Sequence, residues 1–72
     1  MLNYILGPND KIINLTLPNL FKVTGKYYGT TKNFKAIRTS SYERAMNINL
    51  WNGRVWALDS DYKWRMIKEV FN

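Results

Sequence analysis

Short runs in which apolar and polar residues alternate cover much of the chain, and a period of two is typical of β-strands that bury one face. The clearest run spans residues 20–28. One face of this predicted strand carries Phe21, Val23 and Tyr27, and the other carries Lys22, Thr24, Lys26 and Tyr28. The pattern therefore predicts one face in the core and a cationic face in solvent, because lysine and threonine side chains rarely fill a core.

Three further strands are predicted over residues 1–6, 11–17 and 33–39. Gly7-Pro8-Asn9-Asp10 and Pro18-Asn19 are clusters of turn-forming residues that separate them. In the strand over residues 11–17, one face carries Ile13, Leu15 and Leu17. Gly25 predicts a bulge or a close approach of another backbone. We expect the strands over residues 20–28 and 33–39 to pair as a strongly cationic hairpin.

All three tryptophans lie in the last third of the chain, around the pair Asn52-Gly53. Both residues of this pair tolerate the positive φ angles of a two-residue type I′ turn, so the sequence predicts a β-hairpin that turns there. In that hairpin Trp51 faces Arg54, and Trp51 and Trp56 are diagonal neighbours. The opposite, apolar face carries Met46, Ile48, Leu50, Val55 and Ala57. We expect this segment to lie centrally in the sheet, with Arg54 and Trp56 joining a binding surface if their face is uncovered.

Thr39-Ser40-Ser41 predicts the start of a short helix over residues 42–46, because a serine hydroxyl accepts from the free N–H groups of a first turn. Asp59-Ser60-Asp61 predicts a turn. The last segment leaves two structures open, since Tyr62, Trp64 and Met66 alternate as in a strand while Trp64, Ile67, Lys68 and Phe71 fit helical spacing. We favour a strand to about residue 70.

Together these elements predict a single α+β domain over residues 1–72, mainly an antiparallel β-sheet with one short helix. A chain of 72 residues buries only about 60% of the surface that its unfolded form exposes. Without cysteine or histidine, neither disulfides nor a zinc site supplements its core, so we expect a homodimer. No apolar run approaches the roughly 20 residues of a membrane span and no signal-peptide pattern opens the chain. We therefore expect a cytoplasmic protein with no membrane partner.

The net charge of +6 is unevenly distributed along the chain. Residues 11–38 contain six lysines and arginines and no carboxylate, whereas residues 39–72 contain five basic and four acidic groups. A basic patch of this kind favours nucleic-acid phosphates, anionic lipid headgroups or an acidic protein partner. The alternative is a surface that uses lysine only for solubility.

Enzymatic chemistry has little support in the residues available. The chain has no histidine, no cysteine and no glycine-rich phosphate loop. Asp59 and Asp61 form the one close pair of carboxylates, and residues of this type in such a cluster are typical of turns rather than of acid–base catalysis or metal binding. We expect a protein that is not an enzyme and needs no cofactor or metal.

Basic residues interleaved with aromatic residues are the more informative pattern. Proteins that bind nucleic acids on sheets combine rings that stack on bases with lysine and arginine that replace counterions on phosphates. The predicted nucleic-acid-binding residues are Lys22, Lys26, Tyr28, Lys32, Lys35, Arg38, Arg54 and Arg65. The alternative for each ring is that it fills the small core.

The segment Ile48-Asn49-Leu50-Trp51-Asn52-Gly53-Arg54-Val55-Trp56, with the basic C-terminal half around it, resembles small uncharacterised accessory proteins of tailed bacteriophages. Nine Asn, seven Lys, six Ile and five Tyr also fit an AT-rich genome. The resemblance implies an accessory or regulatory factor that acts in the cytoplasm of a host cell.

Two functions stay open. The first is non-catalytic nucleic-acid binding, with RNA or single strands favoured because an exposed ring suits unstacked bases. The second is a protein inhibitor that blocks a host enzyme such as a nuclease or a defence toxin. Tryptophan, arginine and tyrosine in the C-terminal half favour this second function, because these residues dominate interface hot spots.

Overall fold

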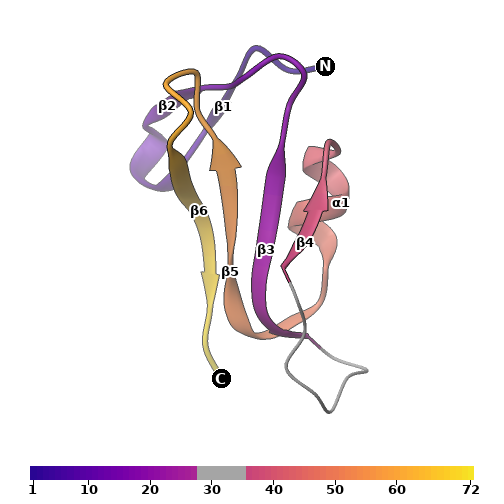
Figure 1. Ribbon diagram of the computed structural model, residues 1–72. Coiled ribbons are helices and arrows are strands. Elements are labelled where there is room, and N and C mark those ends of the chain that lie inside the picture. The colour runs from indigo at the N-terminus through magenta and orange to yellow at the C-terminus, as the bar shows by residue number, and fades with distance from the viewer. Residues whose placement is uncertain (28–35) are drawn as a thin grey trace.

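A four-stranded antiparallel sheet is the main element of the computed structural model, which describes residues 1–27 and 36–72 (Figure 1). Its strand order is β4-β3-β5-β6, with β3 at Phe21–Tyr27, β4 at Ile37–Thr39, β5 at Leu50–Leu58 and β6 at Trp64–Val70. The other elements are β1 (Tyr4–Leu6), the 3-10 helix η1 (Pro8–Asp10), β2 (Ile12–Asn14) and helix α1 (Tyr42–Asn47). β1 and β2 pair as a separate antiparallel sheet. The predicted antiparallel sheet with a short helix is confirmed, although the described chain is mostly β rather than clearly α+β.

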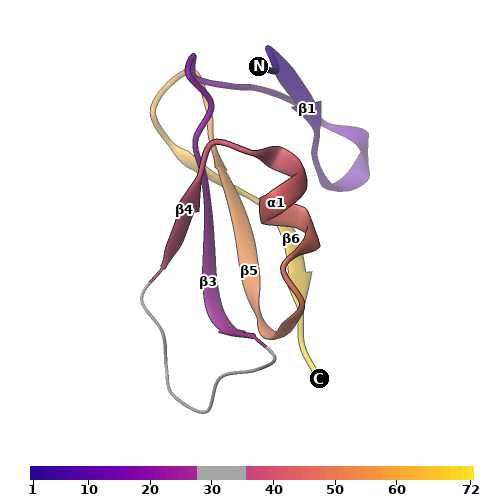
Figure 2. The same cartoon turned by 90° about the vertical axis from the view of Figure 1, so that its right-hand side faces the viewer.

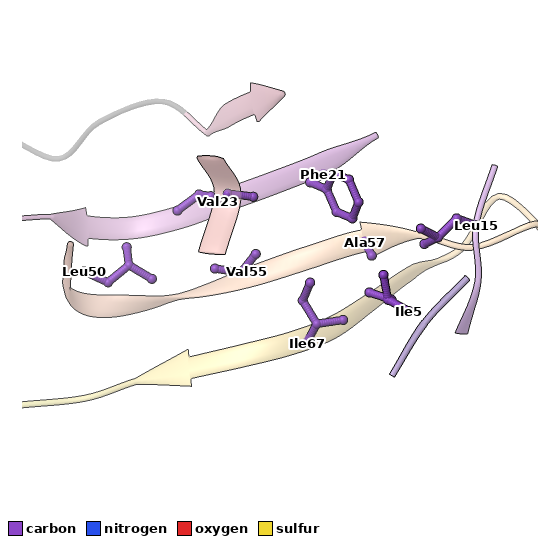
Figure 3. Packing of buried hydrophobic residues seen from close by; sticks show 9 residues of the cluster. Ile5, Leu15, Phe21, Val23, Leu50, Val55, Ala57 and Ile67 are labelled. Carbon is purple, nitrogen blue, oxygen red and sulfur yellow. The ribbon is translucent and has the colours of Figure 1, made fainter. Parts of the chain in front are cut away.

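α1 and the β1–β2 sheet lie on the same side of the four-stranded sheet (Figure 2). The helix packs against β3 and β4, and Lys68 Nζ of β6 donates a hydrogen bond to the carbonyl oxygen of Met46 at 2.9 Å. The core lies between these layers (Figure 3) and consists of Ile5, Leu15, Phe21, Val23, Ala45, Leu50, Val55, Ala57 and Ile67. Burial of these apolar side chains is the main stabilising contribution to the fold.

The alternation predicted for β3 is confirmed at Phe21, Lys22, Val23, Thr24 and Lys26, while the side chain of Tyr27 lies outside what the structure describes. Phe21 and Val23 have exposed fractions of 0%, whereas Lys22 and Thr24 on the other face are half-buried and Lys26 is exposed. β3 pairs antiparallel with β4, as predicted for its cationic hairpin, and with β5 on its other side. Residues 28 and 33–35 of the two predicted strands lie outside the described residues.

The predicted turn at Asn52-Gly53 is wrong, because β5 continues through both residues as one strand. Gly53 pairs with Gly25 of β3 and with Val70 of β6. A Cβ atom at Gly53 would clash with the carbonyl oxygen of Thr24, and one at Gly25 would clash with the backbone of Asn52. The two glycines therefore allow a close approach of two backbones. This approach, with a φ of 109° at Gly25, confirms the expectation for that residue.

The contacts derived from that turn are wrong as well. Trp51 and Trp56 lie on one continuous strand, so they are not diagonal neighbours across a hairpin. The predicted central position of the segment is confirmed, because β5 pairs with both β3 and β6. Leu50, Val55 and Ala57 are buried as predicted. Met46 and Ile48, assigned to the same strand face, precede β5 and pack against the core from α1 and the residue that follows it.

The N-terminal strands are shorter than predicted, since β1 begins at Tyr4 and β2 ends at Asn14. Leu15 is buried and forms an isolated antiparallel β-bridge with Asp59. Leu17, in contrast, is 59% exposed. The predicted face shared by Ile13, Leu15 and Leu17 therefore stops at Leu15. The buried side chain of Asn19 holds this segment in place: its Oδ1 accepts from the N–H group of Leu2 at 2.8 Å, and its Nδ2 donates to the carbonyl oxygens of Leu2 and Thr16 at 2.7 and 2.9 Å.

The C-terminal segment is a strand and not a helix, because β6 pairs with β5 along its length. The predicted turn before it is confirmed. Asp59 Oδ1 accepts hydrogen bonds from the N–H groups of Asp61 and Lys63, both at 2.9 Å, and Tyr62 adopts a φ of 61°. The predicted helix start is also confirmed, because Ser41 Oγ accepts from the N–H group of Arg44 at 3.1 Å.

Candidate nucleic-acid interface

The candidate site is the face of the four-stranded sheet opposite α1, which we call the open face. Strand register assigns its members, since Lys22 lies beside Arg38 on β4 and Trp56 on β5, and Trp56 lies beside Met66 on β6. The open face comprises Lys22, Thr24, Lys26, Arg38, Asn52, Arg54, Trp56, Trp64, Met66 and Glu69. All of these side chains are half-buried or exposed. The layers that form the core lie on the other side of the sheet (Figure 2).

Lys22, Trp56 and Trp64 form a compact group on the open face, which we call the Lys22–Trp56–Trp64 cluster. Lys22 Nζ lies 4.4 Å from the centroid of the Trp64 ring and 5.6 Å from that of Trp56. Trp56 Nε1 donates a hydrogen bond to Thr24 Oγ1 at 3.0 Å, which orients the indole. Cation–π attraction adds to this because the ammonium lies within about 6 Å of each ring. Both indoles are half-buried, so part of each ring faces solvent.

Lys22, Lys26 and Arg38 are the available cations of the open face. Within residues 1–27 and 36–72, no salt bridge joins any of them to a carboxylate. Residues 28–35 contain no aspartate or glutamate either. Positive charge at this part of the face is therefore balanced only by solvent ions, which an anionic ligand can replace.

Arg54 lies on the same face but in a different electrostatic environment. Its Nε is 3.0 Å from Glu69 Oε2, and its Cζ is 5.1 Å from the centroid of the Phe71 ring. The two charged side chains keep 45% and 41% of their surface exposed, so this ion pair is worth less than about 1 kcal/mol. The β5–β6 edge of the open face is consequently less cationic than the β3–β4 edge.

Arg65 does not belong to the open face. Register places it beside buried Ala57, on the side of the sheet that carries the core. Arg65 Nε donates to Asp59 Oδ2 at 2.6 Å. The N–H group of Lys63, the guanidinium of Arg65 and the N–H group of Asp61 lower the pKa of Asp59, and burial opposes them. This ion pair stabilises the β5–β6 turn. The guanidinium of Arg65 is therefore already paired with the carboxylate of Asp59.

The predicted binding residues thus separate into three groups. Lys22, Lys26, Arg38 and Arg54 come together on the open face, and Arg65 lies elsewhere. The remaining predicted residues are Tyr28, Lys32 and Lys35, and they lie outside the described residues. The structure adds Trp64, which the predicted site does not include. No local pattern shows that Trp64 lies near Lys22, because they are 42 positions apart and belong to strands that do not pair directly.

A hollow of about 540 Å³ lies between η1, β2 and the β5–β6 turn. Asp59 and Arg65 line it, but these two groups bond to each other. Among the described residues, no group of three or more histidine, cysteine, aspartate or glutamate side chains is positioned to hold a metal ion. None of the described helices is long and apolar enough to cross a membrane.

Comparisons of the chain with models of protein families, with curated proteins and with solved structures gave no significant match. The geometry and charge of the open face are therefore the guide to function.

Proposed function

We propose that this protein binds nucleic acid non-catalytically through the open face, with RNA or single strands favoured. The observation that carries the proposal is the register that places Lys22, Lys26 and Arg38 side by side, with no carboxylate partner among the described residues. Lysine and arginine side chains in this state release the counterions condensed on a phosphate backbone when they bind it. The two indoles of the Lys22–Trp56–Trp64 cluster supply the aromatic surface that sheet proteins use for unstacked bases.

Titration of a labelled single-stranded oligonucleotide at several salt concentrations tests the proposal. Each neutralised phosphate of a single strand contributes a slope of about −0.7 in log K against log salt concentration. Lys22, Lys26 and Arg38 together give an expected slope of roughly −2. Absence of binding at low salt, or binding that does not respond to salt, would contradict the proposal.

A pair of double variants with equal charge change locates the binding surface. Lys26→Gln with Arg38→Gln removes two cations from the open face. Lys11→Gln with Lys63→Gln removes two exposed cations outside it. The first variant should bind more weakly, and the magnitude of its salt slope should fall by roughly 1.4, at about 0.7 for each phosphate contact. The second variant should keep most of the affinity and most of the salt slope. Equal losses would show that net charge, and not this face, is responsible.

We further propose that the protein acts as a homodimeric phage accessory factor in the cytoplasm of a host cell. The resemblance in residues 48–56 supports this setting, and the small core of a 72-residue chain supports self-association. Sedimentation equilibrium at micromolar concentration should give about twice the mass of one chain. A monomer mass under these conditions would contradict the dimer.

The second candidate function is inhibition of a host enzyme. It is favoured by the outward side of the β1–β2 sheet, where Tyr4 and Leu6 are each 56% exposed and Ile12 is 65% exposed. Exposed apolar side chains that cluster on one surface are typical of protein interaction sites. A pull-down from nuclease-treated host lysate should then retain a partner with the natural chain and lose it with Ile12→Lys. A partner lost on nuclease treatment favours nucleic-acid binding instead.

A further inference from the structure

We infer that the Lys22–Trp56–Trp64 cluster is a base-stacking subsite, so that the open face selects unpaired nucleotides over nucleic acid whose bases are already stacked in a duplex. This inference rests on the proposed nucleic-acid binding and names its substrate class. The chemistry is stacking of a base on an indole, with the phosphate of the same nucleotide held by the neighbouring cations.

The position of the indoles relative to the core is the first argument. The buried side chains of β3 and β5, including Phe21, Val23 and Val55, point to the side of the sheet that α1 covers. Trp56 and Trp64 lie on the opposite face, so they do not complete that core. A tryptophan in a small domain often fills the hydrophobic core. That role does not account for these two rings.

The arrangement of the rings is the second argument. Trp56 and Trp64 stand on adjacent strands, and the hydrogen bond from Trp56 Nε1 to Thr24 holds one indole at a fixed angle. Rings held in place before binding lose little conformational entropy when a ligand stacks on them. Aromatic side chains positioned in this way on a sheet stack with successive bases, and every base has a face suited to such contact.

Lys22 provides the third argument. Its ammonium lies 4.4 Å from the centroid of the Trp64 ring and 5.6 Å from that of Trp56, and no carboxylate among the described residues neutralises it. A nucleotide that stacks on either ring brings a phosphate close to this ammonium, and Arg38 stands opposite Lys22 on the neighbouring strand. Charge and stacking surface thus coincide at one place, which suits a nucleotide better than either an apolar ligand or a simple anion.

Arg54 marks the boundary of this subsite. Glu69 pairs with the guanidinium and the Phe71 ring lies against it. A phosphate at that end of the face meets the carboxylate of Glu69, whereas Lys22 has no carboxylate partner among the described residues. The stacked base is therefore expected at the Lys22 end of β3, and Lys26 contacts a phosphate further along the strand.

Three probes of equal length, about ten nucleotides, test the subsite: oligothymidine, the same backbone without bases, and a duplex. The natural chain should bind oligothymidine more tightly than the abasic strand by about 5- to 150-fold for one stacked base, and more tightly than the duplex. Trp64→Leu should reduce the affinity for oligothymidine toward that for the abasic strand. Indole emission should be quenched by oligothymidine and not by the abasic strand.

Two variants keep the test interpretable. Trp51→Leu removes an exposed indole from the same sheet outside the cluster and should leave all three affinities unchanged. Trp64→Phe keeps a ring, so it should retain part of the preference for oligothymidine even if the leucine variant unfolds. Equal, salt-dependent binding of oligothymidine and the abasic strand would overturn the subsite and leave backbone binding intact. Failure of every probe to bind would overturn both proposals.

Discussion

The two faces of the four-stranded sheet are built from the same strands and have opposite properties. On the face under α1, Phe21, Val23 and Val55 are fully buried and apolar. On the open face, Lys22 contacts two indoles and Lys26 is exposed. Because side chains alternate along β3, residues that are neighbours in sequence serve different surfaces. Stability and ligand binding can therefore be altered separately in this protein.

Replacing Phe21 by alanine should have the largest effect on stability. The ring is fully buried and packs edge-on against Tyr42, with centroids 5.7 Å apart. Truncation of a buried phenylalanine costs about 3–5 kcal/mol. The neighbouring Lys22→Gln should cost less than about 1 kcal/mol and should instead weaken oligonucleotide binding. Urea unfolding of both variants measures the difference, and comparable destabilisation would show that the two faces are not distinct.

Gly53→Ala should have the next largest effect, because the added Cβ clashes with the carbonyl oxygen of Thr24. Overpacking of this kind costs about 1–3 kcal/mol, and it affects the pairing of β3 with β5 that holds both faces together. Asn52→Ala is the matched control in the same strand. The midpoint of urea unfolding should fall for the glycine variant, and no change there would argue that the chain turns at this pair after all.

Acid should destabilise the fold through Asp59, a buried carboxylate on the core side of the sheet. The pKa of Asp59 is lower in the folded chain than its ordinary value of 3.8, chiefly through the N–H group of Lys63 and the guanidinium of Arg65. A depressed folded-state pKa stabilises the protein above the unfolded value, and this stabilisation is lost as pH falls through the folded value. Melting temperatures measured below about pH 4 should fall.

Asp59→Asn should show less of this dependence than the natural chain, since it no longer titrates. Asp61→Asn, which changes an exposed carboxylate in the same turn, should keep it. If the melting temperatures of the natural chain and of Asp59→Asn fall equally as the pH is lowered, this carboxylate does not contribute to the acid destabilisation.

Glu69→Gln should have the smallest effect on stability and a clear effect on binding. The ion pair with Arg54 is exposed, so its loss should cost less than about 1 kcal/mol. The open face gains one net positive charge and an arginine without a carboxylate partner, so affinity for oligonucleotides at low salt should rise. Unchanged or weaker binding would show that Arg54 is too far from the ligand path to contribute.

The cationic half of the open face was predictable because it depends on the alternation of β3 and on its hairpin with β4. Lys22, Lys26 and Thr24 follow from the alternation of β3, and Arg38 follows from the hairpin that β3 makes with β4. The aromatic half was not predictable in the same way. Trp64 reaches Lys22 only through the pairing of β5 with both β3 and β6, and such long-range pairing leaves no local pattern.

The pair Asn52-Gly53 shows where a prediction from a short sequence pattern fails. It has the composition of a type I′ turn, yet Gly53 is paired with Gly25 from a strand 28 positions earlier. Arg65 fails for a similar reason, because the basic residue expected at the interface neutralises Asp59 in a turn that sequence reasoning did identify. The role of Gly53 is decided by a strand distant in sequence, and that of Arg65 by the side chain of Asp59 across the β5–β6 turn.

The sequence by itself determined the kind of fold and one cationic strand face, since the period of apolar residues and the serine cap act over a few positions. Only the tertiary structure decided that β5 runs straight between β3 and β6, and that two indoles gather around Lys22. The physical reason is that strand pairing is set by which backbones can approach and which faces can be buried together. Those conditions hold between distant segments of the chain.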